Sequence, residues 1–147
     1  MALVAKAVVP WTFRGQLFLP EHVGKAEGFV YLITNKSTGK QYVGRKYFWQ
    51  IRKKKGKGRR VRSQSDWQSY MSSSSLLQEE IGHLGLDQFT FEIISVHATR
   101  GDTNYAEVSL QFRLNVLEKD DYLNDAIGKW RRPPAHIIGQ RQLANTA

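Results

Sequence analysis

Two tyrosines and one glutamate are the residues whose types and positions could support catalysis. Tyr31 and Tyr42 flank the turn-like segment Asn35-Lys-Ser-Thr-Gly39, so two paired strands would bring both phenol groups to one site. A phenol can orient a water molecule or, when ionised, accept its proton. Tyrosines of strands more often only pack, half-buried, so spacing alone leaves both interpretations open.

Glu107 places a carboxylate on what the sequence predicts to be an apolar helix face. It shares the spacing i, i+3, i+7, i+10 with Leu110, Leu114 and Leu117. A charge that faces inward must be paired or must hold a cation. The alternative is a partly exposed glutamate in the first turn of a helix, where the helix dipole favours negative charge.

A strongly basic segment runs from Arg45 to Arg62, where ten of eighteen residues are Lys or Arg and none is acidic. Such a run repels itself and favours a negatively charged partner, although a solvated basic loop is the alternative. Gly56 and Gly58 predict a loop in its second half. Contacts with a nucleic-acid backbone are predicted for Arg45, Lys53, Lys54, Lys55, Arg59, Arg60 and Arg62.

The composition narrows the class of protein. The 147 residues suffice for one domain, and the formal net charge of +9 favours a polyanionic partner, most simply nucleic acid. The absence of cysteine excludes disulfides, thiolate metal sites and a cysteine nucleophile, and makes a cytoplasmic location the default expectation. A membrane surface is the other polyanion to consider. No apolar run approaches the ~18–20 residues of a membrane span, which excludes a transmembrane protein, and no membrane partner is expected.

The elements that must position these side chains follow from the residue patterns. β-Branched and aromatic residues on both sides of a glycine turn predict a hairpin. Serines that can cap a helix and a later glycine that can end it predict a first helix. Apolar spacing predicts a further strand and a second helix after it. The predicted elements are a hairpin over 29–44, a helix from Ser75 to about Gly85, a strand over 89–96 and a helix from Asp102 or Thr103 to about Lys119.

This order of elements predicts an α+β fold with a small antiparallel sheet of about three strands, flanked by helices. Residues 1–27 are interpreted as an N-terminal arm with a short strand near 16–19. Residues 28–125 form the predicted domain. Residues 126–147 are interpreted as a tail that packs on the domain or is partly disordered.

The motifs resemble those of the GIY-YIG nuclease family. Phe29-Val-Tyr31 and Tyr42-Val-Gly44 are similar to its two signature motifs, with phenylalanine and valine at the first two positions of the first. Residues 66–75 resemble a segment common in phage-encoded members. Residues 89–94 match the third strand of the family, Glu107 its metal-binding glutamate and Asn124 its late asparagine. The resemblance spans roughly residues 28–125.

The resemblance implies an endonuclease that hydrolyses DNA phosphodiester bonds, one strand per active site. Glu107 would hold one Mg²⁺, which Mn²⁺ could replace. Tyr31 or Tyr42 would orient the attacking water and, as tyrosinate favoured by the surrounding cations, take its proton. The family's arginine follows the second motif on a helix. Arg52 stands at the expected distance, and the alternatives are Arg45, Lys46 and the cations of 59–62. Further roles are implied for Lys46 as a catalytic helper and for Gly44, Tyr70 and Asn124 as supporting residues.

Two other functions fit the charge. A non-catalytic nucleic-acid-binding module on the same fold would explain the basic segment, and a basic structural protein would explain the charge alone. If the chain is a nuclease, a homodimer is one route to double-strand cleavage. If it is phage-encoded, the host cytoplasm is its expected location.

Overall fold

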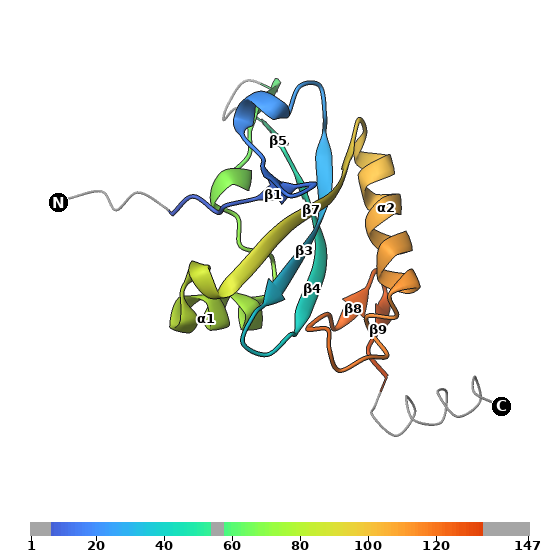
Figure 1. The fold of residues 1–147 in the computed structure, drawn as a ribbon. Helices are drawn as coiled ribbons and strands as arrows, with labels where there is room; N and C mark the ends of the chain where they lie inside the picture. Colours follow the sequence, from blue (N-terminus) through green and yellow to red (C-terminus); the bar gives the residue numbers. More distant parts are fainter. Residues whose placement is uncertain (1–6, 54–57, 134–147) are drawn as a thin grey trace.

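The computed structural model describes residues 7–53 and 58–133, which build a mixed five-stranded sheet in the order β2-β1-β7-β3-β4 (Figure 1). The β1–β7 pair is parallel and the other three pairs are antiparallel. The α+β class is confirmed, with two strands more than predicted. The strands of this sheet are β1 Thr12–Phe13, β2 Gln16–Leu17, β3 Gly28–Asn35, β4 Gln41–Tyr47 and β7 Phe89–His97.

The predicted hairpin is formed by β3 and β4, with Tyr31 opposite Gly44. Gly39 has φ +75° in its turn, a conformation that glycine adopts without steric cost. Strand β3 lies between β4 and β7, which leaves β4 as an edge strand of the sheet. The second tyrosine, Tyr42, therefore lies on an edge.

Two helices cover opposite faces of the sheet (Figure 1). Helix α1, Ser75–Leu84, packs Leu77 and Ile81 against the aromatic core. It begins one residue after its cap, Ser74, whose side chain accepts a hydrogen bond from the Leu77 N–H at 3.2 Å. Its C-cap, Gly85, has φ +86°, so glycine ends the helix as predicted.

Helix α2, Arg100–Arg113, differs from the prediction at both ends. It begins earlier because Thr99 caps it, accepting from the Asp102 N–H at 3.0 Å. It ends earlier because Asn115 has φ +53°, which turns the chain away. Its buried residues are Thr103, Glu107 and Gln111. Polar side chains thus share the inward side with the predicted leucines, since Leu110 and Leu114 pack, partly buried, against the cluster that contains Leu117.

The segment expected as an arm belongs to the sheet and to the core. Trp11 is 1% exposed and lies edge-to-face with the rings of Phe29, Tyr31 and Phe91, at centroid distances of 5.2, 5.2 and 5.6 Å. Its indole N–H donates to the Trp67 carbonyl at 3.0 Å. The N-terminal segment packs on the domain because burying Trp11 among these aromatic rings removes a large apolar area from water.

Beyond residue 125, the chain forms the small hairpin of β8, Ala126–Ile127, and β9, Trp130–Arg131. Ile127 is buried, as expected for a tail that packs on the domain. The Arg132 guanidinium then fixes the preceding turns by donating hydrogen bonds to the carbonyls of Val116, Leu117, Lys119, Tyr122 and Asn124.

The basic segment forms a separate two-stranded hairpin of β5, Trp49–Lys53, and β6, Arg60–Gln64. The loop predicted for its second half is wrong from Arg60 onward, because cross-strand pairing with β5 makes these residues a strand. Three short 3-10 helices complete the fold, η1 Pro20–His22, η2 Trp67–Ser69 and η3 Leu86–Gln88. Within 7–53 and 58–133, neither helix has the length and apolar character that crossing a bilayer requires.

Candidate active site

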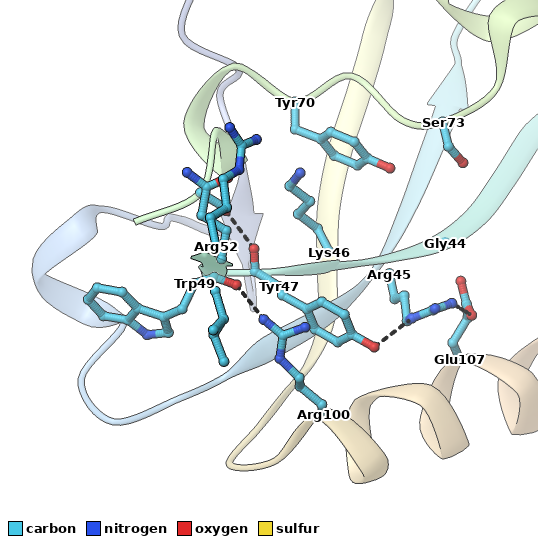
Figure 2. Close-up of a pocket in the computed structure, with 13 residues that line it drawn as sticks. Gly44, Arg45, Lys46, Tyr47, Trp49, Arg52, Tyr70, Ser73, Arg100 and Glu107 are labelled. Atoms are coloured by element: carbon cyan, nitrogen blue, oxygen red, sulfur yellow. Dashed lines mark hydrogen bonds and ion pairs between the residues drawn. The ribbon is translucent and has the colours of Figure 1, made fainter. Parts of the chain in front are cut away.

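The candidate site is a cavity of about 500 Å³ that wraps around the edge strand β4. Side chains alternate across a strand, so Lys46 faces the α1 side of the sheet while Arg45 and Tyr47 face the α2 side. Figure 2 shows Lys46 and Tyr70 on one side of β4, and Arg45, Tyr47 and Glu107 on the other. The cavity is lined by Gly44, Arg45, Lys46, Tyr47, Trp49, Gln50, Ile51, Arg52, Ser65, Tyr70, Ser73, Arg100 and Glu107.

Glu107 is the one acidic side chain among the described residues that line this cavity, and its inward orientation is as predicted. Its side chain is 12% exposed, and its Oε1 accepts from Nη1 of Arg45 at 2.7 Å. Burial raises the pKa of Glu107, and the charge and hydrogen bonds of Arg45 oppose that rise. Arg45, expected to contact nucleic acid, is thus first of all the partner of this carboxylate.

We predict that Arg45→Met raises the pKa of Glu107 further, because burial then acts without the opposing cation. A carboxyl whose folded-state pKa lies above its unfolded value destabilises the fold when it is charged. The variant should therefore be less stable than the unmodified protein at neutral pH, and this difference should shrink as the pH falls through the raised pKa. Carboxyl NMR titration and urea unfolding at two pH values measure both effects. An unchanged or lowered pKa of Glu107 would contradict the prediction.

Tyr47, Arg100 and Asn104 complete the α2 side of the site, and the sequence analysis missed all three. The Tyr47 hydroxyl accepts from Nε of Arg45 at 3.2 Å and donates to Oδ1 of Asn104. The Arg100 guanidinium lies 4.2 Å from the Tyr47 ring centroid and donates to the Trp49 carbonyl at 2.8 Å. The one signal in the sequence that could have identified Tyr47 was the alternation of side chains along a strand, which places residues 45 and 47 on the same face of the sheet.

Lys46, Tyr70 and Tyr42 lie on the α1 side of β4. Nζ of Lys46 is 2.6 Å from Oδ1 of Asp66 and 4.2 Å from the centroid of the Tyr70 ring. The Tyr42 hydroxyl is 3.2 Å from Oγ of Ser73. The structure thus joins Lys46 to Tyr70 and Tyr42 to Ser73 on this side of the strand.

Tyr31 and Gly44 form one packing unit within the hairpin. A Cβ atom on residue 44 would lie 2.3 Å from the Tyr31 hydroxyl oxygen and 2.5 Å from its Cζ. Only glycine leaves room for this fully buried ring. Gly44 thus has a packing role, the close approach of Tyr31, in addition to its place in the lining of the cavity.

Both signature tyrosines are phenols rather than tyrosinates near neutral pH. Burial raises the pKa of Tyr31 well above its ordinary value, and the neighbouring Tyr70 and Tyr42 raise it further. Burial also raises the pKa of Tyr42, although its hydrogen bond with Ser73 opposes the rise. The expected lowering by nearby cations is wrong, because burial is the largest influence on both tyrosines and the charge of Glu107 raises both pKa values as well.

Asn124 closes part of the open edge of the sheet. Its side-chain amide accepts from the Val43 N–H at 3.0 Å and donates to the Val43 carbonyl at 2.8 Å, as a neighbouring strand would. The buried Gln111 donates to the same carbonyl at 3.0 Å. Asn124 therefore supports the site through the position of β4.

The cations of the basic segment occupy three kinds of position. Arg52 is exposed on β5 and lines the cavity; it lies on a strand, not on the helix that the resemblance implied. Arg62 is held by Glu27 at 2.5 Å and lies over the Trp49 ring at 4.8 Å. Lys53, Arg59 and Arg60 are exposed, whereas Lys54 and Lys55 lie outside the described residues.

Fold and cavity together define a small α+β domain whose cavity is lined by four described cations and one described carboxylate. Residues 11–127 match the family model described as "Putative endonuclease segE, GIY-YIG domain". The match covers most of the chain, which therefore belongs to this GIY-YIG endonuclease family. No curated protein and no solved structure matches the chain.

Proposed function

We propose that the protein is a metal-dependent DNA endonuclease that hydrolyses one phosphodiester bond per active site. One observation carries the proposal: the charged residues that line the cavity are the single acid Glu107 and four cations, Arg45, Lys46, Arg52 and Arg100. Phosphate groups match the cations, and one carboxylate suffices for a divalent ion that also binds phosphate oxygens.

The donor set fits Mg²⁺ better than a metal that needs a protein cage. The described residues contain no group of three or more His, Cys, Asp or Glu side chains that could hold an ion. Mg²⁺ prefers hard oxygen ligands, keeps several waters and is often bound by one or two carboxylates together with phosphates. Glu107 would hold it, and Mn²⁺ could replace it. When bound, the ion would polarise the phosphate and stabilise the leaving oxygen.

The side chains of the cavity would then bind the substrate and orient the water. Lys46 lines the cavity from the α1 side of β4, and Arg52 lines it from the β5–β6 hairpin. Both would neutralise charge on the reacting phosphate. Arg45 already holds Glu107 at 2.7 Å; a phosphate entering the cavity offers its guanidinium a second anionic partner. Tyr42, paired with Ser73, would orient the attacking water as a neutral phenol.

The two signature tyrosines are expected to differ in their effect on catalysis. Tyr42→Phe should lower the cleavage rate by about a hundredfold, because its hydroxyl is only partly buried and lies beside the cavity residue Ser73. Tyr31→Phe should have a much smaller effect, because the Tyr31 ring is fully buried and does not line the cavity. Single-turnover cleavage by both variants measures the difference; equal losses would contradict it.

Incubation with supercoiled plasmid tests the proposed function. Conversion to open-circular DNA with Mg²⁺ or Mn²⁺, but not with EDTA, is the expected result. Open-circular DNA should appear before linear DNA, because one active site cuts one strand. Double-strand cleavage then requires a homodimer or a second encounter, and dependence of linearisation on protein concentration distinguishes these routes.

The second candidate is a nucleic-acid-binding module without catalysis. The Arg45–Glu107 ion pair favours it, because it gives the carboxylate a structural partner. DNA that is shifted in a gel but not cut with any divalent ion would support the module and refute the nuclease.

A further inference from the structure

The hairpin of β5 and β6 has two faces of different character. Residues directly opposite each other on paired strands share a face. Gln50 lies opposite Ser63, and Arg52 lies opposite Val61, so these four residues form one face, here called the reading face. Gln50 and Arg52 also line the cavity. Trp49 and Ile51 of the opposite face line it as well, so the hairpin as a whole borders the candidate active site.

The opposite face holds the hairpin against the domain at its base. The Trp49 indole donates to the Ala26 carbonyl at 3.2 Å, and Arg62 joins Glu27 at 2.5 Å. The Arg100 guanidinium fixes the Trp49 carbonyl from helix α2. The orientation of the hairpin relative to the cavity is thus set by contacts from two other parts of the fold.

Farther along the hairpin, two cations lie directly opposite each other. Lys53 pairs in register with Arg60, and both are exposed. Like charges in this arrangement repel in the free protein. A phosphate backbone running past this end of the hairpin would remove the repulsion, which is an argument for DNA as the partner.

The reading face carries groups suited to base edges. It presents an amide, a guanidinium, a hydroxyl and the 46% exposed isopropyl group of Val61. The Gln50–Ser63 hydrogen bond of 3.3 Å uses one amide hydrogen and leaves the amide oxygen available. Phosphate binding needs cations, whereas base edges are read by glutamine, arginine and serine, with apolar contacts to the thymine methyl.

We infer that the β5–β6 hairpin enters the major groove of the DNA and reads bases beside the bond in the cavity. A two-stranded ribbon fits the major groove, about 12 Å wide, whereas the minor groove is only about 6 Å wide. Phosphate contacts come from Lys53 and Arg60, and base contacts from Gln50, Val61 and Ser63. The inference rests on the proposed function for its choice of DNA.

Selection from a random-sequence duplex library, with the unmodified protein in EDTA, tests the inference. A preferred sequence should emerge. Gln50→Ala should weaken the discrimination between bases at one or two positions of the preferred DNA sequence by about five- to a hundredfold. Ser63→Ala should alter the base preference at an adjacent position. Lys53→Ala, the matched control, should weaken binding to all sequences alike and reduce the salt slope by about one. Methylation of guanine N7, in the major groove, should block binding.

The absence of any preferred sequence would overturn the inference, and so would a preference that Gln50→Ala and Ser63→Ala both leave unchanged. Interference only from methylation of adenine N3, in the minor groove, would also overturn it. Selection in EDTA measures binding without cleavage, so failure of the proposed function would appear separately, as binding without cleavage in the plasmid assay. The three substituted side chains are half-buried or exposed, and matching thermal melts establish that each variant folds.

Discussion

Glu107→Gln is expected to lower the rate of plasmid cleavage by about a thousandfold or more, corresponding to roughly 4 kcal/mol of transition-state stabilisation. Glutamine keeps the size of the side chain and can still accept a hydrogen bond from Arg45, so the fold should persist. The negative charge that would hold the metal is lost. Affinity for DNA measured in EDTA should be unchanged or higher, because the cavity loses its one described acidic residue.

The matched control for this variant is Glu79→Gln. Glu79 is exposed on helix α1 and does not line the cavity, so the control makes the same change of charge away from the site. It should cut at the rate of the unmodified protein. If Glu107→Gln also cuts at that rate, Glu107 is no metal ligand, and its role is limited to its ion pair with Arg45.

Gly44→Ala is expected to destabilise the fold by roughly 2–3 kcal/mol, the usual range for forcing extra atoms into a packed core. The added Cβ would lie 2.3 Å from the Tyr31 hydroxyl oxygen. The ring has little room to move, because it is fully buried and packs against Trp11 at 5.2 Å. Thermal unfolding should show a lower midpoint, by on the order of 5–10 °C for a domain of this size.

Gly82→Ala provides the control within the same chain. Gly82 lies inside helix α1, and a Cβ there would meet no atom within 4 Å. Alanine should therefore stabilise the protein by about 0.5–1 kcal/mol, since it restricts the unfolded chain and favours helix. A Gly44→Ala protein that melts with the unmodified one would show that Tyr31 can move, and would remove the packing explanation for this glycine.

Local patterns were sufficient for much of the fold. The hairpin of Tyr31 and Tyr42, the strand over 89–97 and the glycine that ends α1 were predictable because each depends on residues close in sequence. Helical spacing allowed the inward orientation of Glu107 but left a partly exposed position equally open. Thr103 and Gln111 are buried together with Glu107 and stand four residues before and after it. Polar residues at that spacing were the available signal for a polar stripe beside the leucines.

The sequence by itself determined the class of fold, the excess of positive charge and the residues of the two motifs. Tertiary structure decided which groups meet. Arg45 pairs with Glu107 across 62 positions of sequence, and Arg100 reaches the β5–β6 hairpin across 51. Burial, not nearby cations, fixes the pKa of Tyr31 and Tyr42. Such contacts depend on how distant elements pack, and spacing along the chain records only what lies within an element or its turn.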